Sequence, residues 1–206
     1  SFEFADLRKM RLHVIPRRGE LRGTRRDQVP QVRIGHARVL IDALGLRSEK
    51  IEITAMADGY LAAQGVEERM RRGNVMARCR MIALYDQSVD FGGLVIGTSN
   101  KTEILLGYST QFGDAASAVN QIGDLYKAQV YQLARHLGVP APLIDKAPSA
   151  DLFEGQTDEA ELGFTYAEVD RLLYLMVDER RSEDELVARG FELDFVRRIA
   201  KRIAST

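Results

Sequence analysis

One segment constrains the fold more than any other: a short apolar run that ends in small and hydroxylated residues. The run is Leu-Val-Ile at residues 94–96, and Gly-Thr-Ser-Asn-Lys-Thr-Glu follows it at residues 97–103. A continuous apolar run of this length is typical of a buried parallel strand. Open α/β sheets bind ligands at the carboxyl ends of their strands, where short side chains let a ligand approach. The segment therefore predicts a parallel α/β sheet with a binding site that begins at residue 97.

The composition limits the class of protein and its partners. The 206 residues, 45% hydrophobic and 29% charged, suit one globular domain with its own core. A net charge of −1 provides no basic field for nucleic acid or an acidic membrane, so an anionic ligand needs local cations and backbone amides. No apolar stretch approaches the roughly 20 residues of a membrane helix, and no signal peptide is recognisable. The single cysteine, Cys79, excludes an intramolecular disulfide, and the expected location is the cytoplasm.

Hydrophobic periodicity predicts strands that alternate with helices, which favours a parallel sheet flanked by helices. Strands are expected at residues 11–15, 50–54 and 94–96. Helices are expected at residues 36–46, 56–72, 76–91 and 125–137, with three short helices in 166–204. A break is expected at Gly73-Asn74, and loops at 16–30 and 147–163. In the helix at 125–137, the side chains expected to face inward are Val130, Leu133, Ala134 and Leu137.

Further motifs follow residue 103 in a fixed order. They are Gly-Tyr-Ser-Thr at 107–110 with Gly113-Asp114, Gly-Asp-Leu-Tyr-Lys at 123–127, Lys-Ala-Pro-Ser-Ala-Asp-Leu at 146–152, and Gly-Gln-Thr-Asp-Glu-Ala-Glu-Leu-Gly at 155–163. With these motifs the chain resembles the synthetase domain of ammonia-dependent NAD synthetases, of the N-type ATP pyrophosphatase superfamily. The resemblance runs from about residue 36 to residue 204. It implies a Rossmann-like sheet of the adenine nucleotide alpha hydrolase type.

The resemblance also implies a reaction and an organisation. ATP adenylates the carboxylate of nicotinic acid adenine dinucleotide (deamido-NAD), pyrophosphate leaves with the help of Mg²⁺, and ammonia attacks the acyl adenylate to give NAD and AMP. A homodimer is implied as well. We expect one domain over residues 1–206, in which residues 1–35 match poorly, residues 147–163 form a mobile loop and residues 164–206 form the C-terminal helices.

Three candidate residues carry roles in ATP and metal binding that the resemblance implies, beside an ordinary structural explanation. Thr98 is an expected ATP ligand, although a hydroxyl at this place also suits a helix N-cap. Glu103 is the expected Mg²⁺ ligand, although a glutamate in the first turn of a short helix also suits the helix dipole. Lys127 is expected to contact phosphate as a point charge, although a lysine at a helix start is usually a surface residue.

Three more candidates concern the other substrates and the loop. Ser149 is expected to contact ATP phosphate, or else to form an ordinary turn. Arg78 is the expected deamido-NAD ligand; Arg80 points about 200° away on a helix, which makes it a surface residue. Asp114 is expected to hold and deprotonate ammonium as a general base, or else to form a turn. Cys79 is expected to be a small buried hydrophobe rather than a nucleophile.

The sequence departs from the family pattern at its N-terminal end. The Ser-Gly-Gly-x-Asp-Ser loop, which binds pyrophosphate and supplies a second metal-binding carboxylate, is not found, and Gly19 and Gly23 lie among arginines instead. The first strand–loop–helix unit is therefore expected to be missing. Gln111 and Ala118 replace the lysine and aspartate that are usual for dinucleotide contacts. Two alternatives stay open: an inactive nucleotide-binding or dimerisation fragment, and a related enzyme such as a GMP or asparagine synthetase.

Overall fold

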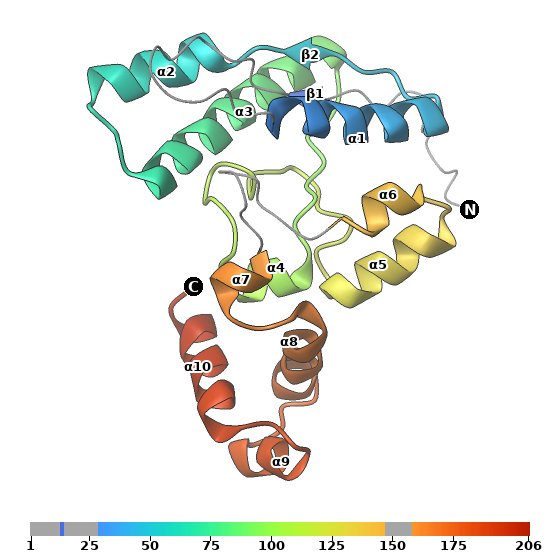
Figure 1. The fold of residues 1–206 in the computed structure, drawn as a ribbon, viewed down its shortest axis with the longest axis vertical. Helices are drawn as coiled ribbons and strands as arrows, with labels where there is room; N and C mark the ends of the chain where they lie inside the picture. Colours follow the sequence, from blue (N-terminus) through green and yellow to red (C-terminus); the bar gives the residue numbers. More distant parts are fainter. Residues whose placement is uncertain (1–12, 15–28, 147–157) are drawn as a thin grey trace.

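The sheet in this protein is small and parallel. The computed structural model describes residues 13–14, 29–146 and 158–206 (Figure 1). Strands β1 (His13–Val14) and β2 (Lys50–Ile51) pair in parallel, with His13 opposite Lys50. A single parallel bridge joins Ile96 to Val119. The expected strand at 94–96 is thus a bridge in the described residues, and the parallel direction agrees with the predicted class.

The strand expected at 50–54 is shorter than predicted because a helix begins inside it. Helix α2 (Thr54–Ala63) starts where the Glu52 carboxylate turns back to the chain. Its Oε1 accepts hydrogen bonds from the Thr54 hydroxyl at 2.5 Å and from the Thr54 backbone N–H at 3.3 Å. By accepting the N–H of the first helical residue, the Glu52 carboxylate favours the helix over continuation of the strand.

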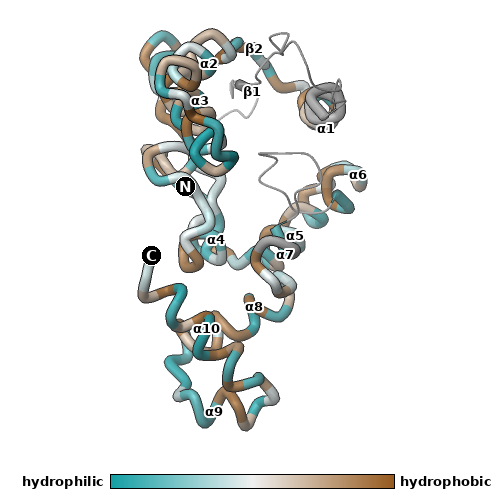
Figure 2. Tube along the Cα trace, turned by 60° about the vertical axis from the view of Figure 1, so that its left-hand side comes forward, coloured by the Kyte–Doolittle hydropathy of each residue, from teal (hydrophilic) through white to brown (hydrophobic). Residues whose placement is uncertain are grey.

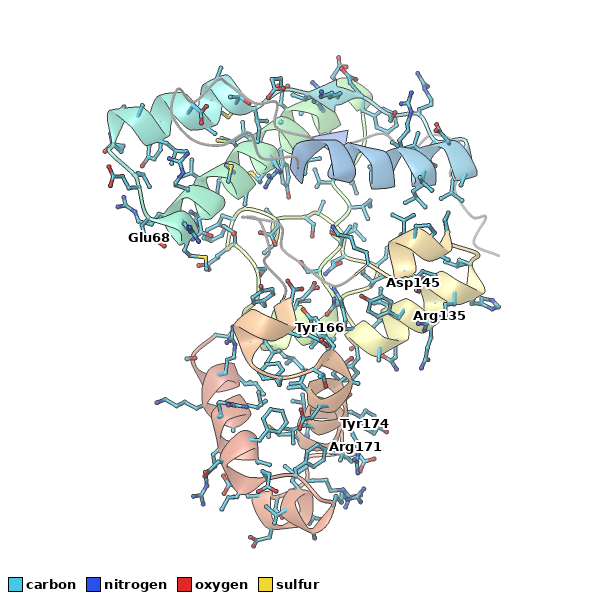
Figure 3. The ribbon with its side chains drawn as sticks, in the orientation of Figure 1. Glu68, Arg135, Asp145, Tyr166, Arg171 and Tyr174 are labelled. Atoms are coloured by element: carbon cyan, nitrogen blue, oxygen red, sulfur yellow. The ribbon has the colours of Figure 1, made fainter. Side chains whose placement is uncertain are left out.

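Helices α1 (Val29–Leu44) and α3 (Arg69–Phe91) flank this strand pair (Figure 1). α1 begins seven residues before the predicted start at 36, so the predicted loop at 16–30 is wrong for residues 29–30, and Gly45, with φ of 59°, follows its last residue. The predicted break at Gly73-Asn74 is wrong, because α3 runs through both residues. The chain breaks at 64–68 instead, where the Glu68 carboxylate (labelled in Figure 3) accepts the backbone N–H groups of Met70 and Arg71 at 2.7 Å.

Two short helices and one longer helix form the middle of the molecule. They are α4 (Lys101–Leu105), α5 (Lys127–His136) and α6 (Ala141–Ile144). α5 runs from Lys127 to His136, within the helix predicted at 125–137 and before Gly138. The predicted inward face of α5 is wrong: no residue of this fully described helix is buried, and Leu137 is 65% exposed. α5 packs against α6 and α8, which leaves Val130 and Ala134 half-buried and Leu133 37% exposed.

The C-terminal part is helical throughout. Its elements are α7 (Asp158–Leu162), α8 (Tyr166–Leu173), the π-helical turn η2 (Tyr174–Asp178), α9 (Glu183–Ala188) and α10 (Leu193–Ala204). The three short helices predicted for 166–204 are confirmed. The predicted loop at 147–163 is wrong for residues 158–162, which form α7, and its remaining part at 147–157 lies outside the described residues.

Two separate groups of buried apolar side chains hold the molecule, at opposite ends of the view in Figure 2. The α2–α3 core consists of Ile53, Ala57, Cys79 and Ala83. The C-terminal core is larger and consists of Leu106, Tyr126, Leu162, Phe164, Tyr166, Val169, Leu172, Leu173, Leu175, Leu186, Phe191, Phe195, Val196 and Ile199.

Burial in the α2–α3 core raises the pKa of the Cys79 thiol, which agrees with the predicted hydrophobic role of this residue. None of the described helices combines the length and the apolar character that crossing a bilayer requires.

Candidate functional site

The segment after the 94–96 bridge enters α4 through a buried asparagine. The Asn100 Oδ1 accepts the Glu103 backbone N–H at 3.0 Å, and the Glu103 Oε2 accepts the Asn100 backbone N–H at 3.1 Å. This reciprocal pair is a capping box, and Asn100 is 2% exposed. The N-cap of α4 is therefore Asn100, so the N-cap explanation for Thr98 is wrong. Thr98 is exposed on the strand end instead.

The structure brings the predicted metal ligand and the predicted phosphate ligand together. The Lys127 Nζ lies 2.8 Å from the Glu103 Oε1, and the two side chains are 18% and 17% exposed. The same ammonium lies 5.1 Å from the ring centroid of Tyr166, which Figure 3 labels where α8 approaches α5. This half-buried ion pair brings one carboxylate and one cation together where the first turns of α4 and α5 meet.

Residues of three helices meet at the first turn of α5. The Lys127 backbone N–H donates to the Thr102 Oγ1 at 3.0 Å, and the Ala128 N–H donates to the Asp170 Oδ2 at 2.7 Å. The Thr102 hydroxyl donates to the Asp170 Oδ1 at 2.5 Å. Burial raises the pKa of the Asp170 carboxyl, against the lowering effect of these hydrogen bonds. Sequence reasoning missed Asp170, since only its place in the fold connects it to Lys127.

The turn that carries Asp114 is tightly built. The Asp114 Oδ1 accepts the Thr110 backbone N–H at 2.8 Å, and the Thr110 hydroxyl donates to the Asn74 Oδ1 at 2.8 Å. Phe112 has φ of 58°, a left-handed conformation that is uncommon for an aromatic residue. A Cβ on Gly113 would lie 2.8 Å from the Thr110 side chain and 3.0 Å from the Ala77 Cβ of α3, so a larger residue would have to displace one of them. The structure thus holds the exposed Asp114 in a defined turn.

A cavity of about 420 Å³ lies between α3, residues 93–98 and the Asp114 turn. Its lining includes Thr98, Arg80 and Asp114 among mostly apolar side chains. A volume of this size falls within the ~300–1,000 Å³ of small-molecule sites. The structure thus assembles two sequence-predicted residues, Thr98 and Asp114, around one concave surface.

The two arginines of α3 differ from the expectation. Arg80 is half-buried in the cavity wall, so its interpretation as a surface residue is wrong. Burial lowers the pKa of the Arg80 guanidinium and the nearby Asp114 raises it, although an arginine stays charged. The exposed Arg78 donates to the Gln111 carbonyl at 3.2 Å and does not line the cavity. Ser149 lies outside the described residues.

Among the described residues, no three His, Cys, Asp or Glu side chains lie together in a way that could hold a metal ion. A magnesium site made of protein ligands alone is therefore not present in this part of the chain. Glu103 offers one carboxylate, and both its oxygens already accept hydrogen bonds. Mg²⁺ commonly takes one or two carboxylates and completes its shell with phosphate oxygens and water. The donor set fits an ion that arrives with a polyphosphate.

Comparison with known proteins decides the family. The NAD synthase family model, described as "NAD synthase", matches residues 26–206. The chain belongs to this family. Over 173 residues it is 56% identical to the NH(3)-dependent NAD(+) synthetase of Chlorobaculum tepidum, a match that covers 84% of this chain and 62% of that relative. The relative from Fusobacterium nucleatum is 50% identical over 170 residues, covering 82% and 66%. The chain thus spans about 62% of the length of the first of these relatives.

Solved structures of the family share the fold. The NH3-dependent NAD synthetase from Campylobacter jejuni, in complex with nitrate, aligns with a TM-score of 0.72 at 30% identity, over 94% of this chain and 72% of that chain. The NMN synthetase from Francisella tularensis aligns with a TM-score of 0.68 at 34% identity, over 84% and 71%. The predicted Rossmann-like fold, a parallel sheet flanked by helices, is confirmed.

Proposed function

We propose that this chain carries the synthetase site that amidates deamido-NAD to NAD, with ATP as co-substrate and ammonia as nitrogen donor. The single observation that carries the proposal is the ion pair of Glu103 and Lys127, 2.8 Å apart at the starts of α4 and α5. In the family resemblance these are the magnesium and phosphate residues, and an unrelated pair of surface charges has no reason to meet at 18% exposure or less.

The ion pair has a direct consequence for nucleotide binding. With a nucleotide bound, Lys127 would contact a phosphate oxygen in place of the Glu103 carboxylate, and Glu103 would be the residue that holds Mg²⁺. When bound, Mg²⁺ neutralises negative charge on the leaving pyrophosphate. Neither side chain would be left as an unpaired half-buried charge, because phosphate would replace Glu103 beside Lys127 and Mg²⁺ would replace Lys127 beside Glu103. Thr98 and Ser149 are proposed as further ATP ligands.

Asp114 is proposed to receive ammonium at the cavity. A carboxylate that takes a proton from ammonium before its attack must lie within hydrogen-bond reach of it. The hydrogen bond from the Thr110 backbone N–H fixes the Asp114 carboxylate, and Arg80 lies in the same cavity wall. We propose Arg78 as a contact of deamido-NAD, with Arg80 as a second cation for the anionic acyl adenylate.

The test compares two glutamates with the same local structure. Glu103 and Glu185 are each the third helical residue of a capping box, and each pairs with a cation at 2.8 Å and 3.1 Å respectively. Glu103→Gln is expected to raise the Mg²⁺ concentration needed for half-maximal NAD formation about tenfold, which corresponds to roughly 1.4 kcal/mol. Glu185→Gln, in the remote helix α9, is the matched control and should leave it unchanged.

The assay is NAD formation by the 206-residue chain from ATP, deamido-NAD and ammonium, with Mg²⁺-dependent binding of a non-hydrolysable ATP analogue measured by calorimetry. Overlapping Mg²⁺ titrations for Glu103→Gln and Glu185→Gln would remove the metal role. Binding without any NAD formation would favour the alternative of a nucleotide-binding fragment. Because the neighbour from Francisella tularensis is an NMN synthetase, the mononucleotide substrate is assayed in parallel.

We also propose that the chain works as a homodimer through the C-terminal half of α3. One face of this half of the helix exposes large apolar side chains at i, i+3 and i+7, with Ile82 51%, Tyr85 37% and Val89 82% exposed. An apolar stripe of this kind marks an interaction surface. Sedimentation of the wild type is expected to give twice the monomer mass, and Val89→Asp is expected to give monomer. A wild-type chain that sediments as monomer at all concentrations would contradict the proposed homodimer.

The cytoplasmic location of the protein stays a prediction.

A further inference from the structure

The first turn of α5 depends on other helices for its hydrogen bonds. Backbone N–H groups in the first turn of a helix have no partner inside the helix. Within the described chain, Tyr126 at the N-cap position makes no side-chain cap to this turn. The acceptors come instead from Thr102 of α4, for Lys127, and from Asp170 of α8, for Ala128.

The Thr102 hydroxyl connects these acceptors into a relay. It donates its proton to the Asp170 Oδ1 and accepts the Lys127 N–H with a lone pair, so its orientation is fixed from both sides. Thr102 is 0% exposed and Asp170 is 6% exposed, which excludes water as a substitute partner. Each carboxylate oxygen of Asp170 thus binds a different helix. Oδ1 binds α4 through the Thr102 hydroxyl, and Oδ2 binds α5 through the Ala128 N–H.

Asp170 lies among fully buried neighbours on α8. Val169, Leu172 and Leu173 on the same helix are all 0% exposed and belong to the C-terminal core. Burying a carboxylate among such residues is unfavourable unless hydrogen bonds compensate. Apolar side chains could join α8 to α4 and α5 without the cost of burying a carboxylate. Asp170 is therefore expected to do more than hold the three helices together.

We propose that Asp170 is a positioning residue for Lys127 and Glu103. Through Thr102 it fixes the first turn of α5 against α4, so that the Lys127 ammonium and the Glu103 carboxylate have one relative geometry when a nucleotide arrives. This inference rests on the proposed role of Lys127 as a phosphate ligand. It assigns to the C-terminal helices a share in nucleotide affinity, although Asp170 does not itself touch the nucleotide.

The experiment measures the dissociation constant of a non-hydrolysable ATP analogue with Mg²⁺ for variants of the full 206-residue chain. Thr102→Val keeps the shape of the side chain and removes both hydrogen bonds of the hydroxyl, and Thr102→Ser keeps both. Thr102→Val and Asp170→Asn are expected to weaken binding about tenfold, the scale expected when buried hydrogen-bonding groups lose their partner. Thr102→Ser is expected to stay within about twofold of the wild type, since it restores the relay.

Asp178→Asn is the control for a merely structural link. Asp178 in η2 also joins these helices, through Lys101 Nζ at 2.7 Å and the Tyr126 hydroxyl at 2.9 Å, but it touches no backbone N–H of the first turn of α5. It should lower the unfolding midpoint without changing the dissociation constant. A loss of affinity equal to that of Asp170→Asn would show that any link between these helices suffices, and would overturn the positioning role.

Lys127→Ala separates failure of this inference from failure of the proposed function. If Lys127→Ala leaves the dissociation constant unchanged, the phosphate role is wrong and the positioning role falls with it. If Lys127→Ala weakens binding while Thr102→Val and Asp170→Asn do not, only the positioning role is wrong. Because an unfolded Thr102→Val would also fail to bind, its unfolding midpoint is measured, and Thr102→Ser decides: wild-type affinity supports the relay, and loss of affinity contradicts it.

Discussion

The C-terminal core and the α2–α3 core differ in the size of what they bury. Among the residues that the structure describes, the C-terminal core contains 14 buried apolar residues and the α2–α3 core contains four. Three of those four are small, namely Ala57, Cys79 and Ala83, so each removes little apolar surface from water. Aromatic and branched side chains such as Phe195 and Ile199 fill the other core. The site therefore lies between two cores whose described buried side chains differ in number and size.

The ligand-binding groups divide along the same line. Lys127 and Glu103 are fixed through Thr102 and Asp170 to the C-terminal core, by backbone and side-chain hydrogen bonds. The cavity with Asp114 is instead walled by α3 of the smaller core. From this difference we expect the proposed ammonia end to open with α3 more readily than the proposed phosphate end, because regions with few buried contacts open at lower free energy.

The largest expected effect comes from truncating one isoleucine in each core. Ile199→Ala should lower the free energy of unfolding by about 4 kcal/mol, and Ile53→Ala by about 2 kcal/mol, because a small core collapses more easily around a cavity. Urea denaturation followed by circular dichroism measures both. Val187→Ala, at a position 41% exposed, is the control and should change little. Equal losses for the two isoleucines would break the comparison.

The single thiol tests the smaller core directly. Cys79 is buried there, and its reaction with a thiol reagent under native conditions requires local opening. We expect an opening free energy about 2 kcal/mol below that of global unfolding, since sub-global openings of weakly packed regions are cheaper. The labelling rate of the urea-unfolded chain supplies the intrinsic rate. Identical free energies for labelling and unfolding would mean that the two cores open only together.

Two helix caps of the same design give a smaller contrast. Asn100 and Ser182 are each the N-cap of a capping box, the first buried beside the site and the second exposed on α9. Asn100→Ala is expected to cost about 2 kcal/mol, because it leaves buried groups unpaired, and Ser182→Ala about 0.5–1 kcal/mol. Thermal unfolding of both variants is the measurement, and a larger loss for Ser182→Ala would contradict the greater contribution expected from the buried cap.

The smallest expected effect concerns pH. The hydrogen bond from Lys101 holds the pKa of Asp178 below its ordinary value of 3.8. A lowered pKa means that Asp178 stabilises the fold above pH 3.8 and that this stabilisation is lost as the pH falls through the lower, folded-state pKa. For this partly exposed pair, Asp178→Asn should cost under about 1 kcal/mol at pH 7, and the difference from the wild type should shrink below pH 3.8.

Asp170 should respond with the opposite sign, because burial raises its pKa. The charged carboxyl is the disfavoured form in the folded state, so protonation between the raised pKa and the ordinary value of 3.8 adds stability. Unfolding midpoints at pH 7, 5 and 3.5 for the wild type and both Asp→Asn variants separate the two contributions. Parallel curves for all three proteins would show that neither carboxyl titrates differently on folding.

Local signals were enough to predict much of the fold. The start of α5 at Lys127, the position of Glu103 in the first turn of α4 and the end of α1 at Gly45 each depend on residues within a few positions along the chain. Amphipathic periodicity likewise sufficed for the C-terminal helices, since α10 places Phe195, Val196 and Ile199 on one face.

What the sequence could not predict depends on partners from elsewhere in the chain. The break before α3 depends on the Glu68 carboxylate, which folds back onto the first turn of the helix. In the sequence alone, Gly73-Asn74 was the stronger signal for a break. The exposed stripe of α5 was misread because periodicity reports a face but not whether anything covers it. Asp170 was missed for the same reason, since it lies 42 residues from the N–H of Ala128 that it accepts.

The hydroxyl of Thr102 has a consequence for inheritance. A group that must donate to Asp170 and accept from the chain at once can be replaced only by serine, and the carboxylate beneath it loses its purpose when the hydroxyl is gone. Substitutions at the two positions are therefore expected to travel together among descendants of this sequence: a lineage that acquires valine at 102 should soon lose aspartate at 170, and one that keeps either should keep both.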